Sequence, residues 1–200
     1  VPGIKHCFIG SGIRYDLCLS DTGNKEVDKT NRRYLETVIR HHVSGRFKVA
    51  PEHCSPTVLG LMRKPAFGLF QQLKSIFDEI NRKHRLNEQI IPYFISSHPG
   101  CRPEDMAKLA VATKTLDFKL EQVQDFTPTP MTVATTIYYS GYHPYSLQKI
   151  DTAKSEKEKK QQNMFFFWYK REFREQIMTL LRRIHRADLI PKLYGKEREK

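Results

Sequence analysis

The sequence predicts an α/β fold with parallel strands, because strand-like runs alternate with helix-like segments along the chain. Each strand-like run ends in a loop of glycine, proline or polar residues, and a helical pattern follows it. Right-handed crossovers of this kind build a parallel sheet. The predicted strands cover residues 5–9, 47–50, 89–95 and 121–126. Four strands do not close a barrel, although they can form part of one.

The clearest strand–helix unit lies between residues 41 and 65. A β-prone run, Phe47 to Ala50, breaks at Pro51 and leaves Glu52 and His53 at the tip of the strand. Ser55-Pro56 supplies a helix cap and a proline at the first helical position, and apolar residues then follow at helical spacing. Ligands bind at the carboxyl ends of strands in parallel α/β folds. We therefore expect functional side chains at this tip.

The other elements follow in order. Gly10-Ser11-Gly12 turns the first strand, and residues 31–42 predict a helix with Tyr34, Leu35, Val38 and Ile39 on its apolar face. A longer helix over 67–85 carries an apolar stripe, which we assign to the core. The run 89–95 is typical of a strand buried on both faces.

The loop 96–100 follows that strand and precedes a helix that starts near residue 102. Small residues at a helix N-terminus suit a polar or anionic ligand. His98 in this loop is either a catalytic group or a histidine bonded to backbone. Residues 132–139 are β-prone and predict either a further strand or a covering segment.

The C-terminal part has a different character from residue 151 onward. A charge run, 154–160, precedes the aromatic cluster 165–169 and a helix with arginines on its outer face. Aromatic rings beside cations can stack on single-stranded nucleic acid, but they also anchor terminal helices. We favour the anchor and keep nucleic acid, or another polyanion bound through residues 154–186, as the alternative.

Composition limits the class of protein. The net charge is +12, from 34 basic and 22 acidic side chains, which suits either solubility or a polyanionic partner. The four cysteines are scattered, so we expect no local metal or iron–sulfur site and a reduced, cytoplasmic setting. No apolar run is long enough for a membrane helix. The start, VPGIKHCFIG, has no initiator Met, and we expect the chain to be cut from a longer protein.

Four strand tips together resemble a known family. Residues 11–14, 48–53, 96–100 and 124–128 (SGIR, KVAPEH, SSHPG and QDFTP) match, in order, the later barrel strands of YgiQ-type radical S-adenosylmethionine proteins. That family is uncharacterised in chemistry and akin to the radical methylthiotransferases. The tail motifs KSEKEK (154–159) and FFFWY (165–169) are similar to the family's C-terminal extension.

The resemblance implies the later part of a partial TIM-type barrel in residues 1–139 and a basic, aromatic helical extension in 140–200. In the family, a C-x-x-x-C-x-x-C loop holds a [4Fe–4S] cluster, which binds S-adenosylmethionine and cleaves it to a 5′-deoxyadenosyl radical. This sequence contains no such loop. The resemblance therefore implies that the cluster lies in the upstream part of the same barrel, and that this chain alone is inactive.

The resemblance also implies cofactor-binding positions, which are Ser11, Gly12, Arg14, Lys48, Glu52, Ser97, His98 and Gly100. Arg14 or Lys48 can pair with a carboxylate, and Glu52 can accept from ribose hydroxyls. The alternative for Lys48 and Glu52 is a mutual ion pair. We expect the isolated chain to self-associate through residues 4–10, whose edge would lack its neighbouring strand. The substrate cannot be identified from these residues.

Overall fold

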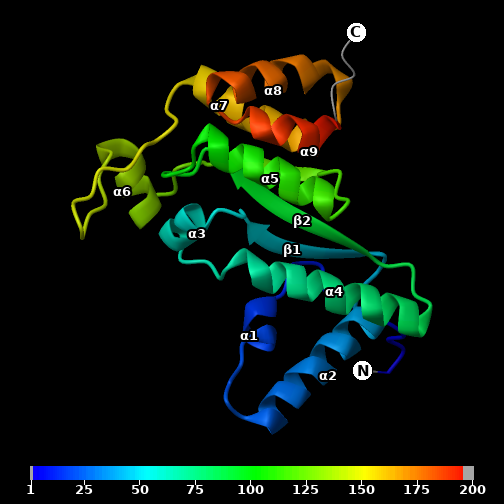
Figure 1. The fold of residues 1–200 in the computed structure, drawn as a ribbon. Helices are drawn as coiled ribbons and strands as arrows, with labels where there is room; N and C mark the ends of the chain where they lie inside the picture. The colour runs from blue at the N-terminus through cyan, green and yellow to red at the C-terminus, as the bar shows by residue number, and fades with distance from the viewer. Residues whose placement is uncertain (1, 196–200) are drawn as a thin grey trace. The chain divides into compact units, whose positions relative to one another are not determined.

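The computed structural model describes residues 2–195 and confirms the α/β fold (Figure 1). Three parallel strands form an open sheet in the order β1-β2-β3, and the described residues close no barrel. The strands are β1 (Arg46–Glu52), β2 (Gln89–Ser96) and β3 (Gln122–Asp125). The helices are α1 (Tyr15–Leu19), α2 (Lys25–His41), α3 (Pro56–Met62), α4 (Phe67–His84), α5 (Pro103–Thr115), α6 (Val133–Ser140), α7 (Glu156–Asn163), α8 (Arg171–Arg183) and α9 (Ile190–Tyr194), with 3₁₀ turns at Met164–Phe167 and Ala187–Leu189.

The chain divides into two compact units. The first contains residues 2–51 and 65–93, and the second contains 52–64 and 94–195. The first residues of β1 and β2 therefore belong to one unit, and their last residues belong to the other.

Helices α1, α2 and α4 pack together in the first unit. The predicted stripe on α4 is confirmed as core, because all of its apolar residues are buried: Phe70, Leu73, Ile76, Phe77 and Ile80. Phe77 stacks on Phe47 of β1 with ring centroids 5.7 Å apart. Core packing of aromatic rings therefore ties α4 to the strand.

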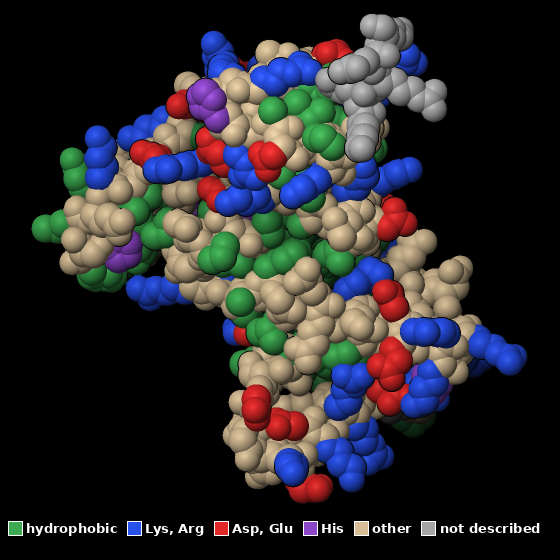
Figure 2. All heavy atoms as spheres, in the orientation of Figure 1, with side chains coloured by type: hydrophobic (Ala, Val, Ile, Leu, Met, Phe, Trp, Pro, Cys, Tyr) green, Lys and Arg blue, Asp and Glu red, His purple; other side chains and the backbone are tan. Residues whose placement is uncertain are grey.

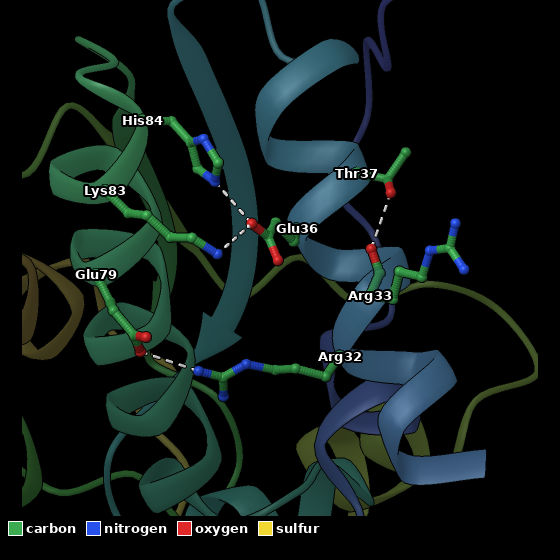
Figure 3. Close-up of polar contacts among 7 residues, drawn as sticks. All are labelled: Arg32, Arg33, Glu36, Thr37, Glu79, Lys83 and His84. Atoms are coloured by element: carbon green, nitrogen blue, oxygen red, sulfur yellow. Dashed lines mark hydrogen bonds and ion pairs between the residues drawn. The ribbon is translucent and has the colours of Figure 1, made fainter. Parts of the chain in front are cut away.

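A polar seam joins the exposed sides of α2 and α4 (Figure 3). Oε1 of Glu36 accepts from Lys83 Nζ at 3.0 Å and from His84 Nε2 at 2.7 Å. The hydrogen bond from His84 has the largest effect on the Glu36 carboxylate, and the bond from Lys83 the next largest. Together they lower the pKa of Glu36 to about 2. Arg32 and Glu79 form a second pair at 3.0 Å.

Helix α2 begins earlier than predicted. Asn24 caps it by accepting from the N–H groups of Glu26 and Val27, so the helix starts at Lys25. Its buried face consists of Leu35, Val38 and Ile39, whereas Tyr34 is 48% exposed. The predicted placement of Tyr34 on the buried face is therefore wrong, because that face is narrower than the pattern suggested.

The predicted strand over residues 5–9 is also wrong, since this segment has no regular structure. Its polar groups bind the end of α2 instead. Ile9 N–H donates to the His42 carbonyl at 2.9 Å, and His42 Nδ1 donates to the Cys7 carbonyl at 2.7 Å. A short β-prone run needs a neighbouring strand, and here a helix terminus satisfies these groups first.

The β-prone segment 132–139 forms helix α6, so the strand alternative is wrong. The Thr132 hydroxyl accepts from Thr135 N–H at the helix start, and Gly141 ends the helix with φ of +78°. Caps at both ends thus outweigh the weak helix propensity of the Thr and Tyr residues between them.

The second unit has a helical core around α5, α7, α8 and α9 (Figure 1). Four residues of α5, Met106, Leu109, Ala110 and Thr113, are buried in this core. Phe165 and Phe166 are buried as well, and Trp168 Nε1 donates to the Thr113 hydroxyl at 3.2 Å. The aromatic cluster therefore anchors the C-terminal helices on α5, as the anchor interpretation predicted.

Candidate functional site

A cleft of about 470 Å³ lies at the carboxyl ends of the strands, and all its lining residues belong to the second unit. Glu52 contributes from the end of β1, Ile95 from β2 and residues 124–127 from the end of β3 and beyond. The end of α3 supplies residues 61–64, and the start of α6 supplies residues 132–134. Strand ends, where polar loop groups converge, are the usual place for a ligand in a parallel sheet.

Glu52 is the central polar group of this cleft. Its backbone is in the left-handed region, with φ of +64°, so the chain turns sharply where β1 ends. Oε1 pairs with Lys64 Nζ at 3.2 Å, and only 13% of the Glu52 side chain is exposed. Oε2 is buried and accepts no hydrogen bond from the described residues. A buried carboxylate oxygen without a donor is costly, so a ligand donor would be held strongly there.

His98 also lines the cleft and is buried. Its Nδ1 lies 2.9 Å from the Pro99 carbonyl, which can only accept, so Nδ1 carries the proton and Nε2 has the lone pair. Burial lowers the pKa of His98, against the opposing effect of the Pro99 bond. The imidazole is therefore neutral at pH 7 and offers an acceptor nitrogen. The bond to backbone foreseen for His98 is present in the structure, and a catalytic role for this residue stays a prediction.

Gln162 of α7 holds the loop between β2 and α5 in place through two hydrogen bonds. Ser97 has φ of +59°, and its N–H donates to Gln162 Oε1 at 2.8 Å. Gln162 Nε2 in turn donates to the Cys101 carbonyl at 2.9 Å. Ser97 and Gly100 are not among the residues that line the cleft. They shape the loop that carries His98.

Gly100 is required by this geometry. Its φ is +82°, and a Cβ there would lie 2.4 Å from Leu61 Cδ1. Its N–H donates to the Asp151 carbonyl at 2.8 Å. The loop is thus held close to α3, the helix whose last residues line the cleft.

Sequence reasoning missed two polar groups of the cleft, Lys64 and Asp125. Asp125 Oδ1 accepts from the Ser96 hydroxyl and, at 3.0 Å, from Asn163 Nδ2. The strand pattern contained Asp125, but its contact with α7 depends on long-range packing. The Lys64 ion pair shows that Glu52 has a partner other than Lys48.

The remaining predicted site residues lie in the first unit. Gly12 passes against the β1 backbone, where an added Cβ would be 3.1 Å from the Lys48 carbonyl oxygen. Arg14 pairs with Asp16 through two contacts of 2.8 and 2.6 Å, which raise the pKa of Arg14. Ser11 and Lys48 are exposed. Cofactor contacts from these four residues stay a prediction.

A buried sulfur–histidine cluster lies near the β1 tip. His53 Nδ1 accepts from Ser55 N–H at 2.9 Å, so Nε2 carries the proton toward Met106 Sδ at 3.4 Å and Cys101 Sγ at 3.5 Å. Burial lowers the pKa of His53 to about 4, and burial raises that of Cys54 to about 12. Neutral groups that satisfy one another are expected of a packed core. Residues 2–195 contain no cluster of His, Cys, Asp and Glu suited to a metal ion.

No helix in the part of the chain that the structure describes is long and apolar enough to span a membrane.

Comparison with known proteins gives two kinds of match. Residues 121–197 match the model of a domain of unknown function, DUF3362. The chain is 60% identical over 196 residues to a UPF0313 protein of Bacteroides thetaiotaomicron, and the matched region covers 98% of this chain and 32% of the relative. A UPF0313 protein of Porphyromonas gingivalis is 58% identical over 195 residues, with 98% and 31% covered. One from Methanocella arvoryzae is 41% identical over 190 residues, with 95% and 30% covered.

The chain spans about a third of the length of these curated relatives. Along almost all of its own length, it is therefore similar to one part of a UPF0313 protein.

Proposed function

We propose that this chain supplies the cofactor- and substrate-facing wall of a radical S-adenosylmethionine enzyme. The observation that carries the proposal is Glu52, a residue of the cleft whose buried Oε2 has no donor among the described residues. The sequence motifs at the strand tips, which resemble those of radical S-adenosylmethionine proteins, support the same function. Residues 1–139 would form the barrel part and 140–200 the extension.

The cleft residues fit S-adenosylmethionine. This cofactor carries ribose hydroxyls and an ammonium group, and each of these groups can donate a hydrogen bond to a carboxylate oxygen. Glu52 would hold one of these donors, while the Lys64 ammonium pairs with Oε1 and orients the carboxylate. Leu61, Ile95 and Phe126 give the cleft apolar surface beside its polar groups, as ligand sites generally require.

The described residues do not fit an iron–sulfur cluster. Such a cluster needs several neighbouring thiolates. Cys101 is buried and Cys54 is half-buried, and desolvation raises the pKa of both thiols, while Cys7 and Cys18 belong to the other unit. The cluster would therefore be bound by another part of a longer protein, as its relatives' length allows.

S-adenosylmethionine with a reduced cluster supplies radical chemistry when both are bound. The chain's own residues would orient the cofactor and the substrate. Glu52 binds a donor, and the loop around His98 is kept rigid by Gln162. His98 Nε2, an acceptor at neutral pH, can hold a ligand N–H or O–H group. The contacts of Ser11, Gly12, Arg14 and Lys48 with the cofactor belong to the same proposal.

Binding of S-adenosylmethionine to this chain tests the proposal by calorimetry. We expect Glu52→Gln to weaken binding about tenfold, since a charged hydrogen bond is worth about 1.5–3 kcal/mol. The matched control is Glu172→Gln on α8, an exposed glutamate that does not line the cleft. Equal affinity of Glu52→Gln and the control would contradict the assignment of Glu52.

For the alternative function, nucleic-acid binding through residues 154–186, Phe165 and Phe166 offer no exposed ring because both are buried, whereas Phe167, Trp168 and Tyr169 are half-buried. The arginines of α8 remain on the surface, where Arg171, Arg174 and Arg183 are exposed.

A further inference from the structure

Exposed aromatic residues gather in a different part of the second unit, around the end of α6. Tyr139 is 69% exposed, Tyr142 49% and Tyr145 74%, and Leu147 beside them is 73% exposed. We call these four residues the tyrosine surface. Figure 2 shows hydrophobic side chains over the region of α6, with Lys and Arg side chains near them. Most large apolar residues of a folded domain are buried, so this concentration calls for a binding partner.

The backbone beneath these rings is ordered by hydrogen bonds. After α6 ends at Gly141, Tyr142 and Lys149 form an antiparallel bridge. His143 N–H donates to the Gln148 carbonyl at 2.9 Å, and Ile150 N–H donates to the Gly141 carbonyl at 2.8 Å. The turn therefore presents its tyrosines on a closed loop, which limits the entropy lost when a partner binds.

The rings themselves are partly oriented. Tyr139 meets Tyr138 edge to face at 5.3 Å, and Tyr145 meets His143 edge to face at 5.7 Å. His143 Nδ1 accepts from the N–H groups of Tyr145 and Ser146, both at 3.3 Å. A T-shaped contact occupies at most one face of a ring, so Tyr139 and Tyr145 each keep at least one ring face clear of these two contacts.

The charge around the tyrosine surface favours an anion. No Asp or Glu occurs from Phe126 to Ile150, and the next acid, Asp151, pairs with Arg102. Lys149 and Lys154 are exposed. Lys154 Nζ donates to the Tyr139 carbonyl at 3.0 Å, and an ammonium group keeps two further donors for a phosphate.

We propose that the tyrosine surface binds single-stranded RNA. Bases would stack on Tyr139, Tyr142 and Tyr145, and Lys149 and Lys154 would contact phosphates. Exposed aromatic rings beside cations are the recurring platform for single strands. Ser146, exposed between Tyr145 and Leu147, offers a hydroxyl to a ribose 2′-hydroxyl, which favours RNA over DNA. This inference does not depend on radical chemistry, because it concerns residues outside the cleft.

Fluorescence anisotropy with labelled oligouridine tests the proposal on the intact chain. We expect Tyr145→Ala to weaken binding about tenfold, since stacking on one ring is worth about 1–3 kcal/mol, and Tyr145→Phe to retain it. Lys149→Gln should lower the slope of log affinity against log salt by about 0.7. The control is Tyr34→Ala on α2, a tyrosine 48% exposed in the first unit, which should bind like the wild type.

Circular dichroism melting of each variant checks that Tyr145→Ala remains folded. Unchanged affinity of a folded Tyr145→Ala variant would overturn the proposal, because binding would then be electrostatic only. Equal affinity for oligothymidine and oligouridine would overturn the choice of RNA. Failure of either arm leaves binding of S-adenosylmethionine at Glu52 untouched, so the two proposals fail separately.

Discussion

Glu52 at the end of β1 forms an ion pair with Lys64 through one carboxylate oxygen, at 3.2 Å, and its other oxygen is buried and has no donor within residues 2–195. Because the Lys64 side chain is 38% exposed, the pair adds little to stability by itself. A strained, largely buried acid with one unused oxygen is more typical of a binding site than of a scaffold.

Gly100 should tolerate no side chain. We expect Gly100→Ala to lower the free energy of unfolding by about 1–3 kcal/mol, because its φ of +82° is unfavourable for alanine and the new Cβ meets Leu61 Cδ1. Urea unfolding measures the change. The double variant with Leu61→Ala should suffer less from the Gly100 substitution than the wild-type background does. Additive effects of the two substitutions would contradict the predicted contact.

Trp168 should stabilise the C-terminal helices. We expect Trp168→Ala to cost about 3 kcal/mol, because it removes a partly buried ring and its bond to the Thr113 hydroxyl. Urea unfolding and acrylamide quenching of Trp168 fluorescence measure the effect and the shielding. Ready quenching in the wild type, together with an unchanged stability of the variant, would speak for a free aromatic cluster. Thr113→Val, which keeps the shape of Thr113 and removes the hydroxyl, isolates the hydrogen bond.

His53 should make stability depend on pH. Its pKa falls from 6.5 to about 4 on folding because of burial, so the unfolded chain binds more protons between these values. Stability is therefore full above pH 6.5 and is lost as pH falls toward 4, by up to about 1.4 kcal/mol per pH unit. The measurement is urea unfolding at pH 7 and pH 5.

His53→Asn is the matched variant, because its side-chain oxygen can still accept from Ser55 N–H without titrating. We expect a smaller pH dependence in this variant, with a remainder from His98, whose pKa is lowered in the same direction. An identical pH dependence in wild type and variant would contradict the assignment.

Self-association of the isolated chain through residues 4–10 remains a prediction. Ile4 is 61% exposed and Phe8 50% exposed, and this segment has no regular structure. Exposed apolar residues favour a dimer, which would shield them from water. Light scattering over a dilution series should show a mass that rises with concentration. Phe8→Ser should shift the series toward monomer, and a monomeric wild type at every concentration would contradict the prediction.

Much of the fold could be predicted because local signals and burial agree. The β1–α3 unit, α4, β2 and α5 carry strong apolar patterns and proline or polar starts, and all four appear in the structure. The segment 5–9 does not form the predicted strand, and residues 132–139 form a helix in place of the strand alternative, because short β-prone runs depend on their neighbours. In the segment 5–9, the carbonyl of His42 at the end of α2 accepts the backbone hydrogen bond of Ile9. In α6, the Thr132 side chain caps the first turn and favours a helix over a strand.

The candidate site could be predicted only in part. The turn after Pro51 pointed to Glu52, and the loop of small residues pointed to His98. The partners of these residues could not be predicted, because Lys64 reaches Glu52 only after α3 folds, and Gln162 reaches Ser97 from α7. Contacts between residues far apart in the sequence depend on packing that a single sequence does not show.

The measurement that tests the central claim most directly uses the full-length UPF0313 protein of Bacteroides thetaiotaomicron, which is 60% identical over 196 residues of this chain. After anaerobic reconstitution with iron and sulfide and reduction with dithionite, we expect it to convert S-adenosylmethionine to 5′-deoxyadenosine. This chain, treated in the same way, should acquire no cluster and form no product. A full-length protein that takes up no [4Fe–4S] cluster and yields no 5′-deoxyadenosine would contradict the assignment of this chain to a radical S-adenosylmethionine enzyme.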